Sequence, residues 1–407
     1  MTEQLIKPHS FEGQLLMLKA NRFIVLDSFR GLCALSVVLF HLHVPYSATE
    51  LGFFRNAHLF VEFFFVLSGF VLFHTYRNAL ANYHDFNPFI VKRIFRLYPL
   101  HFVMFAVFIL FEGGKLLAEM KGLNFNGNAF SGRNALKEII PNLLLLQSWL
   151  NSTDPLSFNG PSWSISAELY VYMLFAAILI LNRKLSLSLF AIISGFAFFA
   201  LAMGLDVLNN NILRVFSCFF AGILAYYIYQ KILNVALPKP MMTVLEGLSL
   251  FMIFLILNGN FKHQGVIASL WFCIVILIFS LEQGHFSSLL KHSFFIRLGK
   301  LSYSIYMIHF AMIFLVISFA ILFSKLSHYD FAPMLNEPQT GELIRYITTH
   351  SIVGNNVLVL AIIAMIIVLA HFSWKYIEKP GMALGERFLL RYKKGVTRSK
   401  AAIDPSV

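Results

Sequence analysis

The segment that most constrains this chain is residues 26–45, LDSFRGLCALSVVLFHLHVP, which is long and apolar enough to form a membrane-spanning helix. It nevertheless carries Asp27, Arg30 and His41, and ionisable groups inside such a helix are costly unless they are paired or used. At about 100° per residue, Arg30 and His41 return to nearly the same helix face, about 16 Å apart along the axis. We therefore expect one stripe to carry a cation near one membrane surface and a titratable base near the other. The alternative is that Arg30 extends its charge to the interface and His41 simply lies there.

Composition identifies the class of protein. Hydrophobic residues make up 58% of the chain and charged residues 13%, whereas soluble domains carry about 25% charged residues, so the chain is predicted to be an integral membrane protein. The net charge of +12 is then expected on loops beside anionic lipid and gives no indication of nucleic-acid binding. The three cysteines lie inside apolar segments, so neither a disulfide framework nor a metal site is predicted.

The apolar pattern predicts an all-α integral membrane protein, a bundle of about ten transmembrane helices. The expected spans are residues 26–45, 57–76, 95–112, 163–182, 186–203, 212–230, 241–257, 264–281, 301–324 and 353–374. A shorter apolar run at 139–150 contains Pro141 and is expected to be re-entrant or interfacial. Two long connections, 113–162 and 325–352, have no obvious fold of their own; they either shape a site or act as passive covers.

Basic residues predict the orientation. If the N-terminus is cytoplasmic, 22 of the 32 lysines and arginines fall on the inner side or in the tail and eight on the outer side, leaving Arg30 and Arg214 within spans. This bias follows the positive-inside rule and predicts that both termini are cytoplasmic. The expected organisation is a cytoplasmic segment at 1–21, a transmembrane domain at 22–380 and a basic cytoplasmic tail at 381–407.

A cationic cluster is expected at the inner surface. Arg93 and Arg96 lie three residues apart on one helix face, with Arg30 at a slightly greater depth in the membrane. Guanidinium groups in such a cluster suit a polyanion, for example the phosphates of a nucleotide-linked donor. The alternative for Arg93 and Arg96 is ordinary anchoring by positive charges on the inner side.

A second polar cluster is expected nearer the outer surface. It combines His41 with Glu168, and Arg214 is a further candidate, so that a carboxylate could hold an imidazole acting as a general base. Glu168 has an alternative role as an acid favoured near a helix N-terminus. His309 is expected near mid-membrane as a packed, hydrogen-bonded core histidine.

Six stretches of the chain resemble, in order, motifs of the membrane acyltransferase-3 family, the group that includes bacterial O-antigen and peptidoglycan O-acetylases. The first is LDSFRGLCALSVVLFH with its Arg-x10-His spacing. The others are FFFVLSGF at 63–70, RIFRLYP at 93–99, WSISAE at 163–168, RVFSCFFAG at 214–222 and LGKLSYSIYMIH at 298–309. The resemblance covers about residues 22–380.

The resemblance implies a ten-helix enzyme that moves an acyl group, usually acetyl, from a coenzyme A thioester to a hydroxyl of a glycan or related acceptor. It also implies that the first-helix arginine and histidine, here Arg30 and His41, are essential, and that Arg93 and Arg96 bind the donor. The remaining motif residues are candidates for contacting the acceptor. These are Trp163, Ser164, Arg214, Tyr303 and His309.

The sequence therefore predicts an acyl-CoA-dependent O-acyltransferase of the inner membrane that acts on a surface glycan or lipid-linked glycan. His41 is the expected general base, and Glu168 is expected to orient it or to hold the acceptor. Arg30 and Arg214 are expected to stabilise negative charge on the donor or on the developing oxyanion. The alternative function is a secondary transporter or lipid-linked glycan flippase. That function predicts inverted repeats with interrupted helices, and the two halves of the chain show no such correspondence.

Overall fold

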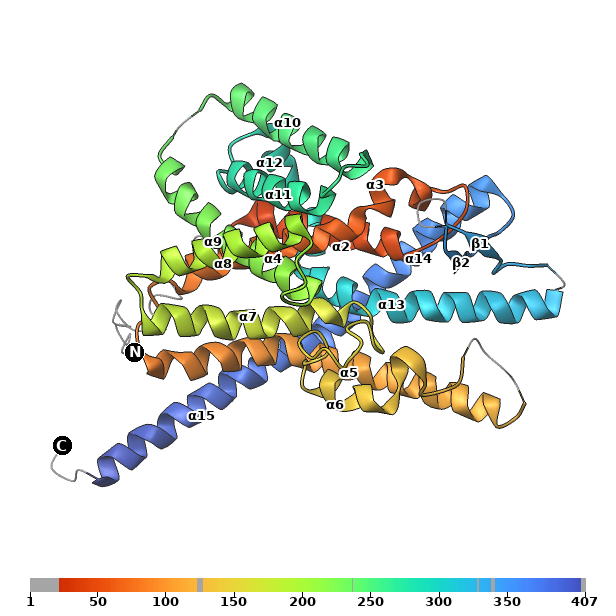
Figure 1. Ribbon diagram of the computed structural model, residues 1–407, viewed down its shortest axis with the longest axis horizontal. Helices are drawn as coiled ribbons and strands as arrows, with labels where there is room; N and C mark the ends of the chain where they lie inside the picture. Colours follow the sequence, from red (N-terminus) through yellow and green to blue (C-terminus); the bar gives the residue numbers. More distant parts are fainter. Residues whose placement is uncertain (1–21, 123–126, 236, 328, 338–340, 404–407) are drawn as a thin grey trace.

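The computed structural model describes residues 22–122, 127–235, 237–327, 329–337 and 341–403. These residues form a helical bundle with two short strands at one end (Figure 1). Nine helical runs among them are long and apolar enough to cross a membrane, and α11 is a shorter apolar helix of 17 residues. The prediction of an all-α, multi-span membrane bundle is therefore confirmed, with nine helices rather than ten reaching spanning length.

The long helices are α2 (Ile24–His41), α4 (Phe60–Tyr76), α5 (Phe86–Glu119), α7 (Ser162–Leu181), α8 (Ser186–Met203), α9 (Asn210–Ile232), α10 (Lys239–Asn258), α11 (Gln264–Ser280), α13 (Ser293–Ser327), α14 (Ile352–Ser373) and α15 (Lys379–Ile403). The shorter elements are α3 (Gly52–Arg55), α6 (Ile139–Leu143), α12 (His285–Leu290), β1 (Met334–Asn336) and β2 (Leu343–Arg345).

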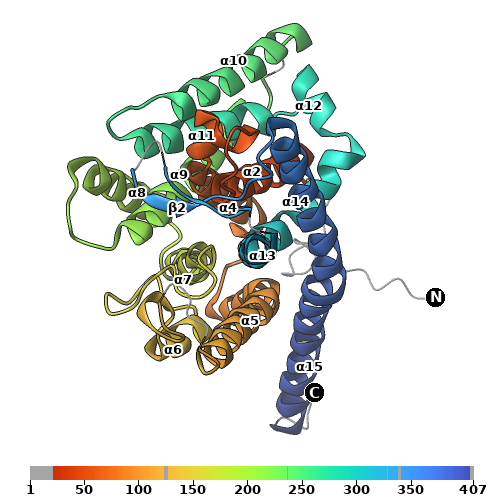
Figure 2. The same cartoon turned by 90° about the vertical axis from the view of Figure 1, so that its right-hand side faces the viewer.

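Helix α13 runs through the middle of the bundle and is seen end-on near the centre of Figure 2. Its 35 residues extend over about 52 Å, well beyond a hydrocarbon core of about 30 Å. The buried residues lie between Leu298 and Ile313, whereas those after Ile313 are half-buried or exposed, for example Phe319. The helix is longer than the expected span of 301–324, because hydropathy does not reveal how far a helix continues past the membrane.

Glycines allow two pairs of helices to pack with their backbones close together. A Cβ atom at Gly31 of α2 would lie 2.6 Å from the carbonyl carbon of Leu298 on α13, and one at Gly299 would lie 2.2 Å from the carbonyl oxygen of Asp27. Helices α4 and α9 meet in the same way at Gly69 and Gly222. Small residues at such contacts are typical of packing between membrane helices.

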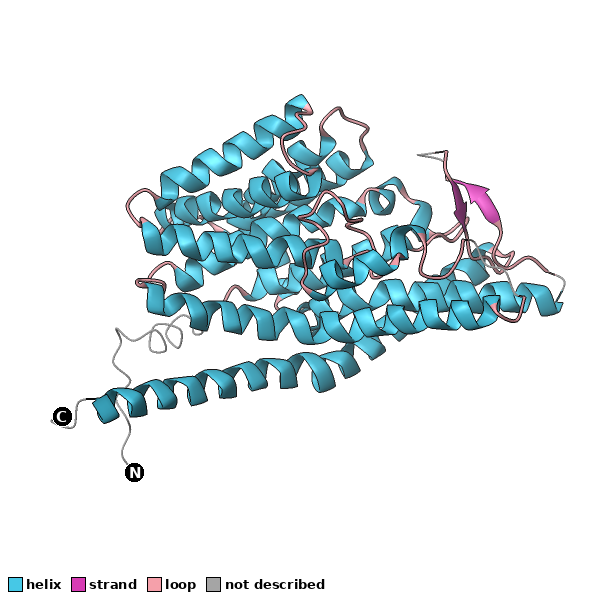
Figure 3. Cartoon of the chain, turned by 60° about the horizontal axis from the view of Figure 1, so that its bottom comes forward, coloured by secondary structure: helices cyan, strands magenta, loops and turns pink. Residues whose placement is uncertain are grey.

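The two long connections are more ordered than expected. In 325–352, β1 and β2 pair antiparallel with Leu335 opposite Ile344 (Figure 3). The backbone N–H of Ile347 donates to the carbonyl oxygen of His43 at 2.9 Å, which attaches this segment to the end of α2. In 113–162, α5 continues to Glu119, and the run 139–150 forms only the five-residue α6, too short to span a membrane.

The expected boundary between residues 380 and 381 does not coincide with a break in the helix. A π-helical turn, Trp374–Glu378, joins α14 to α15, and α15 runs away from the bundle (Figure 1). Near its start, α15 contacts α5, where Gly385 lies against Phe95. The basic tail predicted from 381 onward is therefore a continuation of the last helix as far as Ile403.

Candidate active site

Two histidines from neighbouring helices meet at the end of α2. Nε2 of His309 on α13 lies 3.2 Å from Nδ1 of His41. Nδ1 of His309 lies 2.7 Å from the carbonyl oxygen of Tyr306, and Nδ1 of His41 also lies 3.0 Å from the carbonyl oxygen of Val37. His309 is fully buried, so the prediction of a packed, hydrogen-bonded histidine is confirmed, but its contact with His41 was not predicted.

These contacts assign the protons of the neutral histidine pair. A carbonyl oxygen can only accept, so Nδ1 of His309 carries a proton and its Nε2 carries a lone pair. Nδ1 of His41 then faces two acceptors, the Val37 carbonyl oxygen and His309 Nε2, and must be the protonated nitrogen. His41 Nε2 is left with a lone pair that can accept a proton from another molecule.

Glu168 lies away from this pair. Its carboxylate accepts hydrogen bonds from the hydroxyls of Ser68 and Tyr172, and within the described ranges no hydrogen bond joins it to His41. The sequence predicts both groups at one level because each lies near the outer end of its expected span. Since α7 begins at Ser162, Glu168 lies about 9 Å along the helix axis from that end, where it lines a cavity together with Arg30. The expected His41–Glu168 contact is therefore wrong, and His309 is the partner of His41.

The cavity that contains Glu168 is small, and its lining combines polar and apolar side chains. Its volume is about 60 Å³, enough for a few water molecules. The hydroxyl of Ser164 donates to the hydroxyl of Tyr306 at 3.0 Å, and the carbonyl of Tyr306 contacts His309, so polar groups extend from the cavity to the histidine pair. The polar lining residues come from α2, α4, α7 and α13. They are Arg30, Ser68, Ser164, Glu168, Ser302, Tyr303 and Tyr306.

Three predicted arginines gather beside this cavity. Arg96 lies within electrostatic range of both Arg30 and Arg93, so the expected grouping is present. Arg93 donates from Nη2 to the Tyr76 hydroxyl at 3.0 Å, while its Nε is buried without a hydrogen-bond partner in the described part of the chain. A buried guanidinium N–H with no acceptor is costly, so this position suits an anionic ligand.

Arg214 makes a different contact from the one expected. Its Nε donates to the carboxylate of Glu62 on α4 at 2.8 Å, and its guanidinium carbon lies 4.8 Å from the centre of the Trp163 ring. Glu62 is buried, so this ion pair compensates a charge on each of two helices in the bundle interior. Arg214 and Trp163 are therefore brought together, but no hydrogen bond joins Arg214 to His41 or Glu168 among the residues described.

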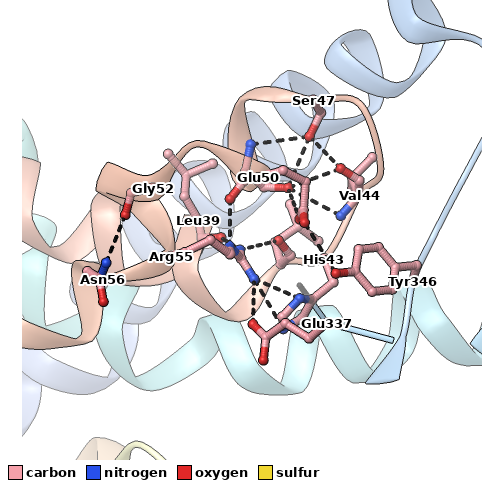
Figure 4. A network of polar contacts seen from close by, with 12 residues as sticks. Leu39, His43, Val44, Ser47, Glu50, Gly52, Arg55, Asn56, Glu337 and Tyr346 are labelled. Carbon is pink, nitrogen blue, oxygen red and sulfur yellow. Dashed lines mark hydrogen bonds and ion pairs between the residues drawn. The ribbon is translucent and has the colours of Figure 1, made fainter. Parts of the chain in front are cut away.

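A buried arginine fixes the end of α2 (Figure 4). Arg55 donates to the carbonyl oxygens of Leu39 and Leu42, at 2.7 and 3.0 Å, and to Nδ1 of His43 at 2.7 Å. Glu337, beside the β1–β2 hairpin, lies 3.8 Å from the same guanidinium. Burial and the nearby charge of Arg55 lower the pKa of His43 to about 3. The end of α2 that carries His41 is thus hydrogen-bonded to Arg55, and Arg55 in turn forms an ion pair with Glu337 beside the hairpin.

Comparison with known proteins identifies the family. An acyltransferase domain model matches residues 23–377. The chain belongs to the acyltransferase-3 family. Acyltransferase MdmB of Streptomyces mycarofaciens is 34% identical over 126 residues, which cover 31% of this chain and 29% of that protein. Protein 2 in the picA locus of Rhizobium radiobacter is 38% identical over 88 residues, or 21% of this chain and 44% of that protein. The matches thus cover less than half of either relative, and no solved structure matches.

One buried carboxylate of this chain was missed in the sequence. Glu378 ends the π-helical turn, is 3% exposed and accepts a hydrogen bond from the Ser304 hydroxyl at 3.0 Å. It also lies within electrostatic range of Arg30 and Arg96. Its position just beyond the last predicted span, among lysines, gave it the pattern of a cytoplasmic tail residue. A π-helical turn is a frequent mark of a functional site and would have been the structural signal.

Proposed function

We propose that this membrane acyltransferase transfers an acyl group, acetyl in the simplest case, from acyl-CoA to a hydroxyl of a cell-surface or lipid-linked glycan. The observation that carries the proposal is the hydrogen bonding of the histidine pair, which leaves a lone pair on His41 Nε2. His309 acts through its contact with His41 and is a positioning residue in this scheme.

The proposed reaction has one proton cycle. His41 Nε2 accepts the proton of the acceptor hydroxyl as that oxygen attacks the thioester carbonyl carbon. The C–S bond then breaks, the coenzyme A sulfur leaves, and the protonated imidazole returns the proton to it. The imidazolium that forms between these steps is stabilised because His41 Nδ1–H already donates to two acceptors.

The donor is proposed to bind through Arg30, Arg93 and Arg96. Their grouping and the partnerless Nε of Arg93 supply donors and positive charge for phosphate groups. Glu378 would offset the mutual repulsion of Arg30 and Arg96 when no phosphate is present, since it is a buried acid within electrostatic range of both.

The acceptor is proposed to approach His41 at the C-terminal end of α2, whereas the arginine cluster lies at its N-terminal end. Trp163, Ser164 and the pair of Arg214 with Glu62 offer the aromatic and hydrogen-bonding groups that suit a sugar. The excess of basic residues on one side supports an orientation with both termini and the arginine cluster in the cytoplasm of an inner-membrane protein.

The direct test uses membranes that contain the full chain and acetyl-CoA labelled in its acetyl group. Mass spectrometry of surface polysaccharide from cells with and without the protein identifies the acceptor, and label transfer to that acceptor measures the rate. His41→Gln should reduce the rate by about 10²–10⁴-fold, the usual contribution of a general base, while His84→Gln at an exposed position should not change it. A His41 variant within about tenfold of the parent rate would remove His41 from the role of base.

The donor site is tested separately. Arg93→Gln and Arg96→Gln should raise the KM for acetyl-CoA with a smaller change in kcat, because they remove binding made equally in ground and transition states. Unchanged affinity for acetyl-CoA in both variants would contradict the assignment of the arginine cluster to the donor.

A further inference from the structure

A groove of about 520 Å³ lies between the start of α13 and the end of α14. Its volume is within the range of about 300–1,000 Å³ that is usual for small-molecule sites. Phe294 and Leu301 of α13 and Val368 of α14 are among its apolar walls. It shares no lining residue with the cavity that contains Arg30 and Glu168, so it is a separate feature of the molecule.

The polar groups of this groove carry one sign of charge. Arg297 and Lys300 lie three residues apart on one face of α13, His371 adds an imidazole from α14, and none of the described residues that line the groove is an acid. Both cations are exposed, and neither makes a hydrogen bond or ion pair within the residues that the structure describes. Arg30, at the same end of the bundle, instead lies 3.8 Å from Asp27.

The position of the groove matches the surface of a membrane. Gly299, beside the two cations, packs against the backbone of Asp27 in the first turn of α2, so the groove opens at the end of the bundle where α2 begins. The basic bias assigns this end to the cytoplasmic side, where anionic lipids concentrate. Trp374 and Phe372 line the same groove, and aromatic rings are typical of the level of lipid head groups.

We propose that this groove binds one anionic phospholipid. The lipid phosphate lies between Arg297 and Lys300, and an acyl chain lies along Phe294, Leu301 and Val368. Two uncompensated cations beside an apolar channel complement a molecule that joins a negative head to a long apolar tail, and basic pockets between membrane helices are known to hold such head groups. A free phosphate would leave the apolar walls uncovered, and a zwitterionic lipid would leave the cations without net compensation.

The test is native mass spectrometry of the full chain in detergent, with phosphatidylglycerol and phosphatidylcholine of identical acyl chains added at equal concentration. We expect phosphatidylglycerol to be retained and phosphatidylcholine to be lost. Arg297→Gln combined with Lys300→Gln should weaken retention by about fivefold per charge, hence about 25-fold together. Lys184→Gln combined with Lys239→Gln makes the same change in net charge at exposed positions outside the groove and should leave retention within about twofold.

A second variant tests the apolar channel of the groove while keeping both charges. Val368→Trp fills the channel, keeps both cations and should also abolish retention, whereas Arg297→Lys should preserve it. Equal retention of both lipids, or full retention by the Gln pair or by Val368→Trp, would refute the proposal. Displacement of the lipid by acetyl-CoA would also refute it, because the groove would then belong to the donor site. If the Gln pair does not fold, the lipid comparison on the parent chain and Val368→Trp decide the question.

Discussion

Replacing Arg55 by methionine tests whether the end of α2 depends on one buried guanidinium. The substitution keeps an unbranched apolar chain in place of the arginine methylenes but removes the donors to the carbonyl oxygens of Leu39, Leu42 and Thr49. Each buried carbonyl left without a donor costs about 1–3 kcal/mol. The site lies near the end of the bundle, where water can replace some donors. We therefore expect the free energy of unfolding to fall by about 3–5 kcal/mol in total, the usual result of breaking a buried charged contact.

The assay uses the buried thiols of Cys33 and Cys218 as reporters of unfolding. A thiol-reactive fluorophore added to the detergent-solubilised protein should report an unfolding midpoint lower by on the order of 10 °C for Arg55→Met. Transfer activity of the folded fraction should fall by about 10²-fold, the effect of displacing a reacting group by about 1 Å, because His41 lies between two of the freed carbonyls. Arg55→Lys should give an unfolding midpoint and an activity between those of the parent and Arg55→Met, since an ammonium group does not reproduce the forked set of donors of a guanidinium.

Arg345→Met is the matched control for this experiment. Arg345 belongs to β2 of the hairpin, and among the described residues its guanidinium makes one hydrogen bond, to the backbone oxygen of Ala332 at 2.8 Å. Its loss should therefore cost only about 1 kcal/mol and leave the rate unchanged. If Arg55→Met unfolds no earlier than Arg345→Met and retains full activity, the guanidinium does not hold the end of α2, and the reasoning from its hydrogen bonds fails.

Three further predictions concern packing, pH and the histidine pair. Gly222→Ala should strongly destabilise the protein in the same thiol assay, because its Cβ would lie 1.9 Å from the carbonyl oxygen of Val66. Gly195→Ala is the control: its Cβ would have no atom within 4 Å, so it should be neutral or slightly stabilising. Acidification below pH 6.5 should lower the free energy of unfolding by up to about 1.4 kcal/mol per pH unit, less any solvent screening. The reason is that His43 binds a proton in the unfolded state, whereas in the folded state its pKa is lowered to about 3 and it stays neutral. His43→Gln should reduce this dependence of stability on pH. His309→Leu removes the acceptor for His41 Nδ1–H and should lower kcat with little change in the KM for acetyl-CoA, and equal changes in both would contradict a positioning role.

The helices, and the end of the bundle at which a residue lies, could be predicted from the sequence. Which helices lie side by side could not. Apolar runs of spanning length predicted the helices, and the expected grouping of Arg30, Arg93 and Arg96 is present because all three lie near one end of the bundle. The pairing of Arg214 with Glu62 depends on which helices touch, and hydropathy contains no information on that contact. The extent of a helix was also misjudged where it continues past its expected span, as for α13.

The register of α2 against α13 connects the two ends of the proposed site. Gly31 packs on the backbone at Gly299, and His41 meets His309, so both contacts join residues 268 positions apart. Two helices with the same rise that stay in contact at the same offset over ten residues run parallel for about 15 Å. A shift at the glycine contact would therefore move the whole segment up to the histidines, because no loop lies between them to absorb it. The glycine contact thus sets the distance between His41 and His309 although neither glycine touches a reacting group, and Arg30, which adjoins Gly31, is held in the same frame.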